Sequence, residues 1–206
     1  MLVVGIPSGQ RLEQCKAVIK AWRDQPVKIA LLTWDSSYID LYDQVDYYIA
    51  QPSRYSYAKN HNYTAKLTAD EGWNGYICGA DDLYPGSNID KLEDVCIQRS
   101  NELIWVFDGL NPSIMTHPIV TRGYYEKKGY IFDEQFVHNF CDTDLLVREW
   151  RNTIRVVGVT FDHRWYRSGD DEIYAIGRKS FEADKQRFIA KHGDKDVQIR
   201  IQQLYV

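Results

Sequence analysis

The sequence predicts a single α/β domain in which helices flank a sheet that is parallel in its amino-terminal half. The chain has 206 residues, which suits one domain with a substantial core better than two. Hydrophobic residues make up 44% and charged residues 26%, which is ordinary for a folded domain. Short apolar runs alternate with helical patterns along the first half, and this alternation is typical of a parallel sheet.

The elements of the amino-terminal half follow from apolar spacing. Short apolar runs predict strands at 2–6, 27–34, 45–50 and 76–79. Apolar residues at helical spacing predict helices at 11–23 and 56–70. The first helix shows this spacing most clearly, with one apolar face formed by Leu12, Cys15, Val18, Ile19 and Trp22.

The carboxy-terminal half is expected to continue the α/β pattern. Helices are predicted at 89–99, 143–151 and 180–191, and Asp142 or Thr143 is expected to cap the second of them. Strands are predicted at 102–107 and 153–161, with a further extended stretch at 119–125.

Composition excludes several classes of protein. The cysteines Cys15, Cys78, Cys96 and Cys141 lie far apart without a C-x-x-C pair, which argues against a zinc cluster or a disulfide framework. The formal charge of −4 disfavours a general polyanion binder. No apolar stretch approaches the roughly 20 residues of a membrane span, and the first residues do not resemble a secretion signal. We therefore expect a cytoplasmic protein without a membrane span.

The most informative motif is the acidic pair Asp81-Asp82, which follows the strand predicted at 76–79. Open α/β sheets bind ligands at the carboxyl ends of their strands. Two adjacent carboxylates repel each other unless a cation or hydrogen-bond donors compensate. Mg²⁺ or Mn²⁺ held by one or two carboxylates usually completes its shell with phosphate oxygens and water. The pair therefore suggests a cation with a diphosphate ligand, although a simple turn before Leu83 is the alternative.

Four short motifs follow one another along the chain in a recognisable order. They are the turn Ile6–Arg11, the helix start at 54–60, the pair Asp81-Asp82 and the acidic motif at 141–144. In this order they resemble the nucleotide-sugar glycosyltransferases of the GT-A fold, most closely those similar to glycosyltransferase family 2. The resemblance covers roughly residues 2–191. It implies one catalytic domain over 1–206 with a Rossmann-like mixed sheet flanked by helices. The donor-binding half would span about 1–100 and the acceptor half about 101–206.

The resemblance also implies roles for individual residues. Asp82 would hold Mn²⁺ or Mg²⁺, and His163 would close the metal site. Asp142 would be the catalytic base, with Asp144 as the second candidate. The nucleotide would contact Pro7, Ser8, Arg11, Asp35, Arg54, Lys59, Asn60 and Asp81.

Two positions differ from the family pattern. Gly79 stands where the fuller acidic motif begins with Asp, and Cys141 stands where Glu usually precedes the base.

Most of these residues also have a purely structural interpretation. Asp142 precedes an apolar helix, where Asp is a common N-cap. Asp35 follows a strand and can simply begin a turn, and His163 can be a surface histidine. Arg54, Lys59 and Asn60 can be solvated helix residues.

The resemblance implies metal-dependent transfer of a sugar from a nucleotide diphosphate donor to an acceptor hydroxyl. A UDP-sugar is the first donor expected, and the transfer is expected to invert the anomeric configuration. The acceptor is expected to be a glycan or small molecule, and a hydroxylated nucleic-acid base is the alternative. A nucleotidyltransferase ranks lower, because the first turn carries only Gly9 and Arg11 and no further basic residue to grip a triphosphate. A non-catalytic nucleotide-sugar binder of the same fold is the remaining alternative.

Overall fold

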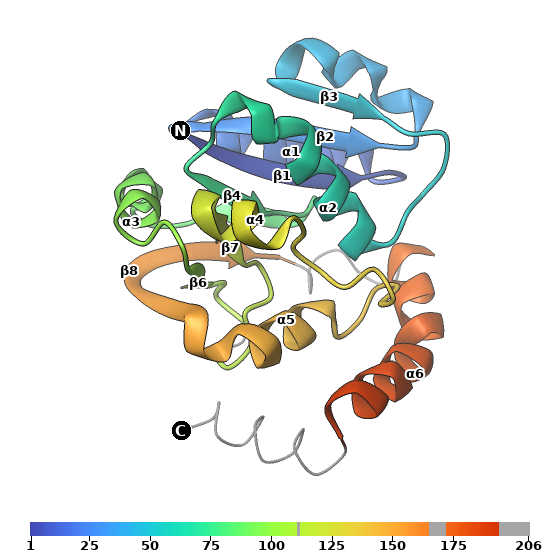
Figure 1. The fold of residues 1–206 in the computed structure, drawn as a ribbon. Helices are drawn as coiled ribbons and strands as arrows, with labels where there is room; N and C mark the ends of the chain where they lie inside the picture. The colour runs from blue at the N-terminus through green and yellow to red at the C-terminus, as the bar shows by residue number, and fades with distance from the viewer. Residues whose placement is uncertain (111, 165–171, 194–206) are drawn as a thin grey trace.

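The computed structural model describes residues 1–110, 112–164 and 172–193 (Figure 1). Across this part of the chain, the strands form one sheet in the order β3-β2-β1-β4-β7-β6-β8-β5. The strands are β1 (Leu2–Ser8), β2 (Val27–Thr33), β3 (Tyr47–Ala50), β4 (Gly75–Cys78), β5 (Leu83–Pro85), β6 (Leu103–Phe107), β7 (Ile119–Thr121) and β8 (Thr153–His163).

The sheet is parallel where the sequence predicts it. β1 pairs in parallel with β2 and β4, and β2 pairs in parallel with β3. β7 lies antiparallel between β4 and β6, and β5 lies antiparallel to β8. The result is a mixed α/β sheet, as expected, with its parallel half formed by the first strands of the chain.

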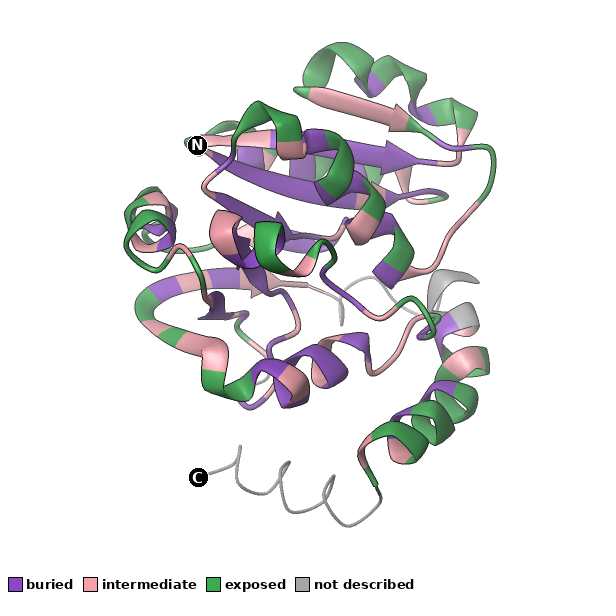
Figure 2. Cartoon of the chain, in the orientation of Figure 1, coloured by how far each residue is buried: buried purple, intermediate pink, exposed green. Residues whose placement is uncertain are grey.

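Helices cover both faces of the sheet. Successive side chains of a strand point to opposite faces, so the apolar residues of the buried strands need packing partners on both sides. Leu2, Val4 and Ile6 of β1 join the core that includes α1 (Leu12–Arg23) and α3 (Leu92–Gln98), whereas Val3 joins the core on the other face. That second core includes residues from α2 (Tyr57–Thr68), α4 (Arg122–Lys128), α5 (Cys141–Glu149) and α6 (Glu172–His192). Figure 2 shows the buried central strands and the exposed outer faces of the helices.

Short 3₁₀ turns connect several of these elements: η1 (Ser36–Gln44), η2 (Ala69–Glu71), η3 (Ile89–Lys91) and η4 (Trp150–Asn152). Among the described residues, none of the helices is long and apolar enough to cross a membrane.

Two sequence predictions about secondary structure are wrong in detail. The stretch 119–125 is not extended throughout, because β7 ends at Thr121 and α4 begins at once. Tyr124 and Tyr125 favour strands intrinsically, but here helix α4 buries both rings in the core. The last helix starts at Glu172 rather than at 180.

The start of α5 also differs from the prediction. The helix begins at Cys141, and its N-cap is Phe140 with a left-handed backbone (φ 63°) and no side-chain cap. Asp142 therefore lies in the first turn and is not the cap. Its Oδ1 accepts a hydrogen bond from the backbone N–H of Thr143 at 2.7 Å.

The pairing of β5 with β8 brings two distant segments together. Leu83, directly after the acidic pair, lies opposite His163 at the end of β8. The backbone N–H of Arg164 donates to the carbonyl of Asp82 at 2.9 Å, and that of His163 donates to the carbonyl of Asp108 at 3.0 Å. The end of β8 is therefore fixed between the residues that follow β4 and β6.

Asp184 of α6 anchors the loop before α5. Its side chain is fully buried and accepts hydrogen bonds from the backbone N–H groups of Val137, His138 and Asn139, each at 3.0 Å. Burial raises the pKa of Asp184, but these hydrogen bonds outweigh it and hold the pKa below its ordinary value. The contacts couple α6 to the loop that leads into Asp142.

We expect Asp184→Asn to lower the free energy of unfolding at pH 7 by about 3 kcal/mol, because an amide cannot replace all these acceptor bonds. The lowered carboxyl pKa stabilises the fold above about pH 4, and this stabilisation is lost as the pH falls through the folded-state pKa. As the pH falls from 5 to 2, the free energy of unfolding should therefore decrease less for the variant than for the wild type. Denaturant titration at each pH measures this difference. Glu182→Gln, on an exposed position of the same helix, is the control. Equal pH profiles for the wild type and Asp184→Asn would contradict the assignment.

Candidate functional site

A cleft of about 410 Å³ opens at the carboxyl ends of β1, β4 and β6. The start of α2, the start of α5 and the end of β8 complete its walls. The residues that line it include most of those predicted from the sequence: Pro7, Ser8, Arg11, Arg54, Asn60, Asp81, Asp82, Asp142 and His163. The remaining walls are partly aromatic and apolar, with Trp34, Tyr55, Tyr57, Leu110 and Ile114 among them.

Three predicted site residues do not line this cleft. Asp35 begins a turn, where it accepts hydrogen bonds from the backbone N–H groups of Ser37 at 3.0 Å and Gln10 at 3.2 Å. Lys59 is exposed, with its ammonium 4.1 Å from the centre of the Tyr55 ring.

Asp144 is fully buried outside the cleft. It accepts a hydrogen bond from His192 at 2.7 Å and forms an ion pair with Lys191 at 2.8 Å. Both partners belong to α6, so Asp144 connects α5 to α6 rather than facing a ligand.

Asp81 is held by the first turn of the chain. Its carboxylate accepts hydrogen bonds from Ser8 Oγ at 2.7 Å and from the Arg11 guanidinium at 3.1 Å. Burial and the neighbouring Asp82 raise the pKa of Asp81 to about 6, with Arg11 and Ser8 opposing them. Tyr38 extends the network, because its hydroxyl accepts from the backbone N–H of Arg11 at 2.9 Å. Asp81 thus fixes the opening turn against the acidic motif.

Asn60, which also lines the cleft, offers a buried acceptor. Its Nδ2 donates weakly to the Tyr55 carbonyl at 3.4 Å, whereas its Oδ1 has no hydrogen-bond partner within the described part of the chain. A buried polar atom without a partner is costly unless a ligand or water satisfies it. Arg54 lies nearby in the lining with its guanidinium 5.6 Å from the centre of the Trp34 ring.

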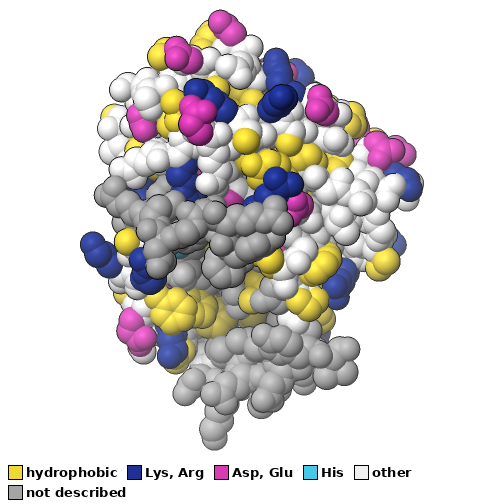
Figure 3. Space-filling view, turned by 180° about the vertical axis from the view of Figure 1, so that it is seen from behind, with side chains coloured by type: hydrophobic (Ala, Val, Ile, Leu, Met, Phe, Trp, Pro, Cys, Tyr) yellow, Lys and Arg dark blue, Asp and Glu magenta, His cyan; other side chains and the backbone are white. Residues whose placement is uncertain are grey.

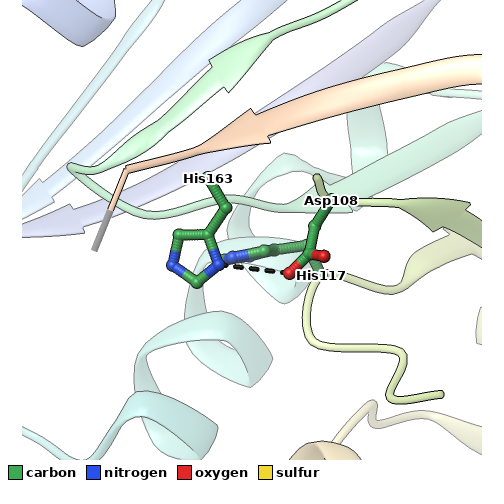
Figure 4. A group of neighbouring side chains, drawn as sticks. All are labelled: Asp108, His117 and His163. Carbon is green, nitrogen blue, oxygen red and sulfur yellow. Dashed lines mark hydrogen bonds and ion pairs between the residues drawn. The ribbon is translucent and has the colours of Figure 1, made fainter. Parts of the chain in front are cut away.

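Asp82 and His163 lie together, and two further residues join them. His163 Nε2 is 3.6 Å from Asp82 Oδ1, and His163 Nδ1 is 3.2 Å from Asp108 Oδ2. Asp108, His117 and His163 offer ligand atoms that all lie within 4.8 Å of one another. Figure 4 shows these three side chains pointing toward one another. Asp108 follows the end of β6, His117 lies just before β7, and His163 is the last residue of β8.

His117 has one nitrogen engaged and one without a partner. Its Nδ1 lies 2.9 Å from the carbonyl oxygen of Cys78, which can only accept, so Nδ1 carries the proton. Burial and the neighbouring His163 lower the pKa of His117 to about 3, which keeps the ring neutral. Nε2 therefore bears a lone pair, and within the described residues it is buried without a hydrogen-bond partner. A neutral histidine whose other nitrogen donates to a carbonyl is the usual form of a metal ligand.

Asp108 and His117 were not predicted as site residues. Asp108 directly follows the strand predicted at 102–107, so the signal used for Asp81-Asp82 also applies to it. An isolated Asp-Gly pair is equally typical of a turn, and Asp108 does accept a hydrogen bond from the N–H of Leu110 at 3.1 Å. No local pattern marks His117.

Asp142 lines the same cleft from the first turn of α5. Burial raises its pKa, and the hydrogen bond from the backbone N–H of Thr143 partly opposes this effect. A carboxylate with a raised pKa is a stronger base than a solvated one. Asp142 and the Asp82–His163 pair therefore come from different elements that line one cleft.

The geometry also explains why Gly79 occupies the first position of the acidic motif. A Cβ on Gly79 would lie 2.7 Å from the carbonyl oxygen of Gly5 and 2.8 Å from a methyl group of Val4. Both atoms belong to β1, the neighbouring strand, and its backbone cannot move aside without disturbing the sheet.

We expect Gly79→Asp to destabilise the protein by about 1–3 kcal/mol through this overpacking, even though it adds the carboxylate of the fuller motif. Thermal unfolding of the metal-free protein would measure the change. An unaltered melting temperature would contradict the steric argument.

No family model matches the sequence, and no curated protein sequence matches it. The fold, in contrast, has solved relatives. A mannosyltransferase, PcManGT from Pyrobaculum calidifontis in complex with GDP-Man and Mn²⁺, matches 79% of this chain with a TM-score of 0.57 and 9% sequence identity. The chain has a glycosyltransferase-like fold. It covers 56% of the length of that mannosyltransferase.

A second solved structure has the same fold at similar distance. A197 from STIV matches 79% of this chain and is itself covered over 84%, with a TM-score of 0.52 and 10% sequence identity. At these identities the glycosyltransferase-like fold is shared, and the function has to be argued from the cleft itself.

Proposed function

We propose that the protein is a metal-dependent glycosyltransferase that moves a sugar from a nucleotide diphosphate donor to an acceptor hydroxyl. The observation that carries the proposal is the cleft, whose lining combines a cluster of carboxylates and imidazoles with the half-buried carboxylate of Asp142. A glycosyl transfer needs both functions, because the leaving diphosphate must be neutralised and the attacking hydroxyl must lose a proton.

The nucleotide would bind along the wall formed by the first turn and the start of α2. Arg11 and Arg54 supply positive charge there, and Asn60 Oδ1 is an acceptor that a ribose hydroxyl or a base N–H would satisfy. Pro7 and Ser8 shape the turn, and Asp81 holds Arg11 in place through their ion pair at 3.1 Å. Asp35 and Lys59 would contact only those donor atoms that extend beyond the cleft. We take a UDP-sugar as the first donor to test.

The cation would be Mn²⁺ or Mg²⁺, held by Asp82 and His163 with Asp108 and His117. Within the described residues, Nε2 of His117 is buried without a hydrogen-bond partner, which supports a metal ligand at this position. When bound, such a cation supplies Lewis-acid stabilisation of the negative charge on a leaving diphosphate.

Asp142 would act as the base that accepts the proton of the acceptor hydroxyl during a single, inverting displacement. Its raised pKa and its place in the cleft wall support this role. Asp144 is not needed for it, since its carboxylate is engaged by α6. The apolar side chains of Leu110 and Ile114, which also line the cleft, suit the flat face of a sugar or another small hydroxylated acceptor.

Surface charge does not favour a nucleic acid as the acceptor. On the face drawn in Figure 3, basic and acidic side chains of the described residues are interspersed rather than gathered into a basic patch. Together with the formal charge of −4, this supports a glycan or small molecule over a hydroxylated nucleic-acid base.

A panel of nucleoside diphosphates and nucleotide sugars, each with and without Mn²⁺, tests the proposal. A donor that binds the native state should raise the melting temperature by mass action. Hydrolysis or transfer of the stabilising donor, followed by chromatography, then measures catalysis. Stabilisation without turnover against a broad acceptor panel would identify a non-catalytic binder. Stabilisation by triphosphates alone would point to a nucleotidyltransferase.

A further inference from the structure

We infer that His138 is a donor-binding residue, which hydrogen-bonds the sugar-bearing phosphate of the nucleotide, and that α6 holds its ring in place for this contact. The inference rests on the proposed function for the class of ligand. It concerns a histidine outside the cluster of Asp108, His117 and His163, in a loop that none of the sequence motifs includes.

The ring of His138 differs from those of the other histidines. His61, His117, His163 and His192 each engage at least one ring nitrogen in a hydrogen bond. Within the described part of the chain, the ring nitrogens of His138 make no hydrogen bond, and the residue is half-buried in the lining of the cleft. A neutral imidazole carries one donor and one acceptor, so this ring can bind a polar ligand without giving up an existing bond.

Helix α6 fixes the loop that carries this ring. The backbone N–H groups of His138 and Asn139 both donate to Oδ2 of the buried Asp184, at 3.0 Å each. The side-chain amide of Asn139 also donates to the carbonyl of Gly177 at 2.7 Å. Asp184 and Gly177 both belong to α6, so the protein itself sets the position of His138 before any ligand binds.

Gly177 leaves room on α6 for the ring itself. A Cβ at this position would lie 2.6 Å from Cδ2 and 3.0 Å from Nε2 of His138. Glycine is unfavourable inside a helix, and the backbone of Gly177 does not adopt the left-handed conformation that would call for it. The imidazole accounts for the glycine, because a methyl group here would push the ring from its place.

The charges around the ring indicate an anion as its ligand. Burial lowers the pKa of His138, and the positive charge of Arg54 adds to this effect. Arg11 acts in the same direction, whereas the carboxylates of Asp184 and Asp82 oppose it. The ring is therefore neutral at pH 7 and keeps an N–H to donate. It lies within electrostatic reach of both the arginines and the metal cluster, and a diphosphate would contact these same two groups.

The position of His138 along the chain selects one of the two phosphates. His138 precedes Asp142 in the same segment, and its carbonyl oxygen lies 4.0 Å from Sγ of Cys141. The proposed base must reach the hydroxyl that attacks the sugar, so the phosphate bonded to the sugar is the one nearer to Asp142. We therefore assign the contact of His138 to the second phosphate of a nucleoside diphosphate.

The test compares nucleotides that differ by this phosphate. UDP and GDP, and in parallel UMP and GMP, are titrated into the wild type and the variants by calorimetry with Mn²⁺ present. We expect His138→Ala to weaken diphosphate binding by about 10-fold to 100-fold, as for a lost hydrogen bond to a charged group. The affinity for the matching monophosphate and the melting temperature should change far less.

Three further variants separate a hydrogen bond from a merely structural role. His138→Asn places an amide near the position of Nδ1 and His138→Gln near that of Nε2, so one of them should retain most of the diphosphate affinity. Gly177→Ala keeps the imidazole but displaces it, and we expect the same selective loss as in His138→Ala. Gly177→Ala also provides the comparison if His138→Ala does not fold.

Lys179→Ala is the control, because Lys179 is an exposed residue of α6 outside the cleft lining, and it should bind as the wild type does. The inference is overturned if neither diphosphate binds the wild type, or if His138→Ala binds the diphosphate normally. Equal losses for diphosphate and monophosphate, or Asn and Gln variants that both bind as weakly as His138→Ala, also overturn it.

These outcomes are distinct from failure of the proposed function, because the measurement is binding and not turnover. A protein that transfers a sugar while His138→Ala binds the diphosphate normally refutes only the role of His138. A protein whose diphosphate binding depends on His138 but which transfers no sugar refutes only glycosyl transfer.

Discussion

Asp142→Asn is expected to lower turnover by about 10²-fold to 10⁴-fold while leaving donor affinity nearly unchanged. A general base acts only in the transition state, and the Asn side chain has the same shape but cannot accept the proton. Asp142 is not the N-cap of α5, and its Oδ1 accepts from the N–H of Thr143, a bond that the Asn carbonyl can still accept. The loss should therefore appear in kcat and not in the melting temperature.

The control for Asp142→Asn is Asp144→Asn, two residues along the same helix. Asp144 has ion-pair partners on α6, so its substitution should lower stability and affect the rate only through folding. A rate at the wild-type level for Asp142→Asn, or a rate defect confined to Asp144→Asn, would contradict the assignment of the base. Proton NMR of the product is an independent check, because retention of anomeric configuration would exclude a single displacement.

Asp82→Ala is expected to abolish the metal dependence of nucleotide diphosphate binding and to weaken that binding by about 100-fold or more, a few kcal/mol. Asp82 is buried in the lining of the cleft, and its Oδ1 lies 3.6 Å from Nε2 of His163. Calorimetry of UDP and GDP binding, with and without Mn²⁺, measures the effect.

Asp90→Ala is a suitable control for Asp82→Ala, because Asp90 is exposed and does not line the cleft. It removes one negative charge from the same region of the sequence, so it corrects for net charge. Metal-dependent binding that survives in Asp82→Ala, or is lost equally in Asp90→Ala, would show that Asp82 does not contribute a ligand.

Much of the fold could be predicted because local patterns determine local structure. The apolar runs at 2–6, 27–34 and 76–79 are strands of the parallel half of the sheet, as predicted. The helix predicted from 56 begins where Ser56 Oγ accepts from the N–H of Lys59. Prediction failed at α4, where burial of tyrosines against the core outweighed their preference for strands.

The site residues differ in the same way: some can be predicted from neighbouring residues in the sequence, and others are placed only by the order of the strands. Asp82 was found because an acidic pair at a strand end is visible in a few consecutive residues. His117 was missed because its position depends on β7 being inserted between β4 and β6, where Pro118 accepts a hydrogen bond from the N–H of Cys78 at 3.0 Å. No short stretch of sequence carries that strand order.

The amino-acid sequence by itself determined the α/β class, the parallel first half and the acidic residues at the ends of β4 and at the start of α5, since each depends on neighbours in the chain. Only the tertiary structure decided which of these residues meet. The pairing of β5 with β8 places His163 beside Asp82 and Asp108, and the attachment of α6 through Asp144 and Asp184 directs one carboxylate into the core while Asp142 faces the cleft. The physical reason is that strand order, register and helix docking are set by the packing of the whole core, which no local periodicity records.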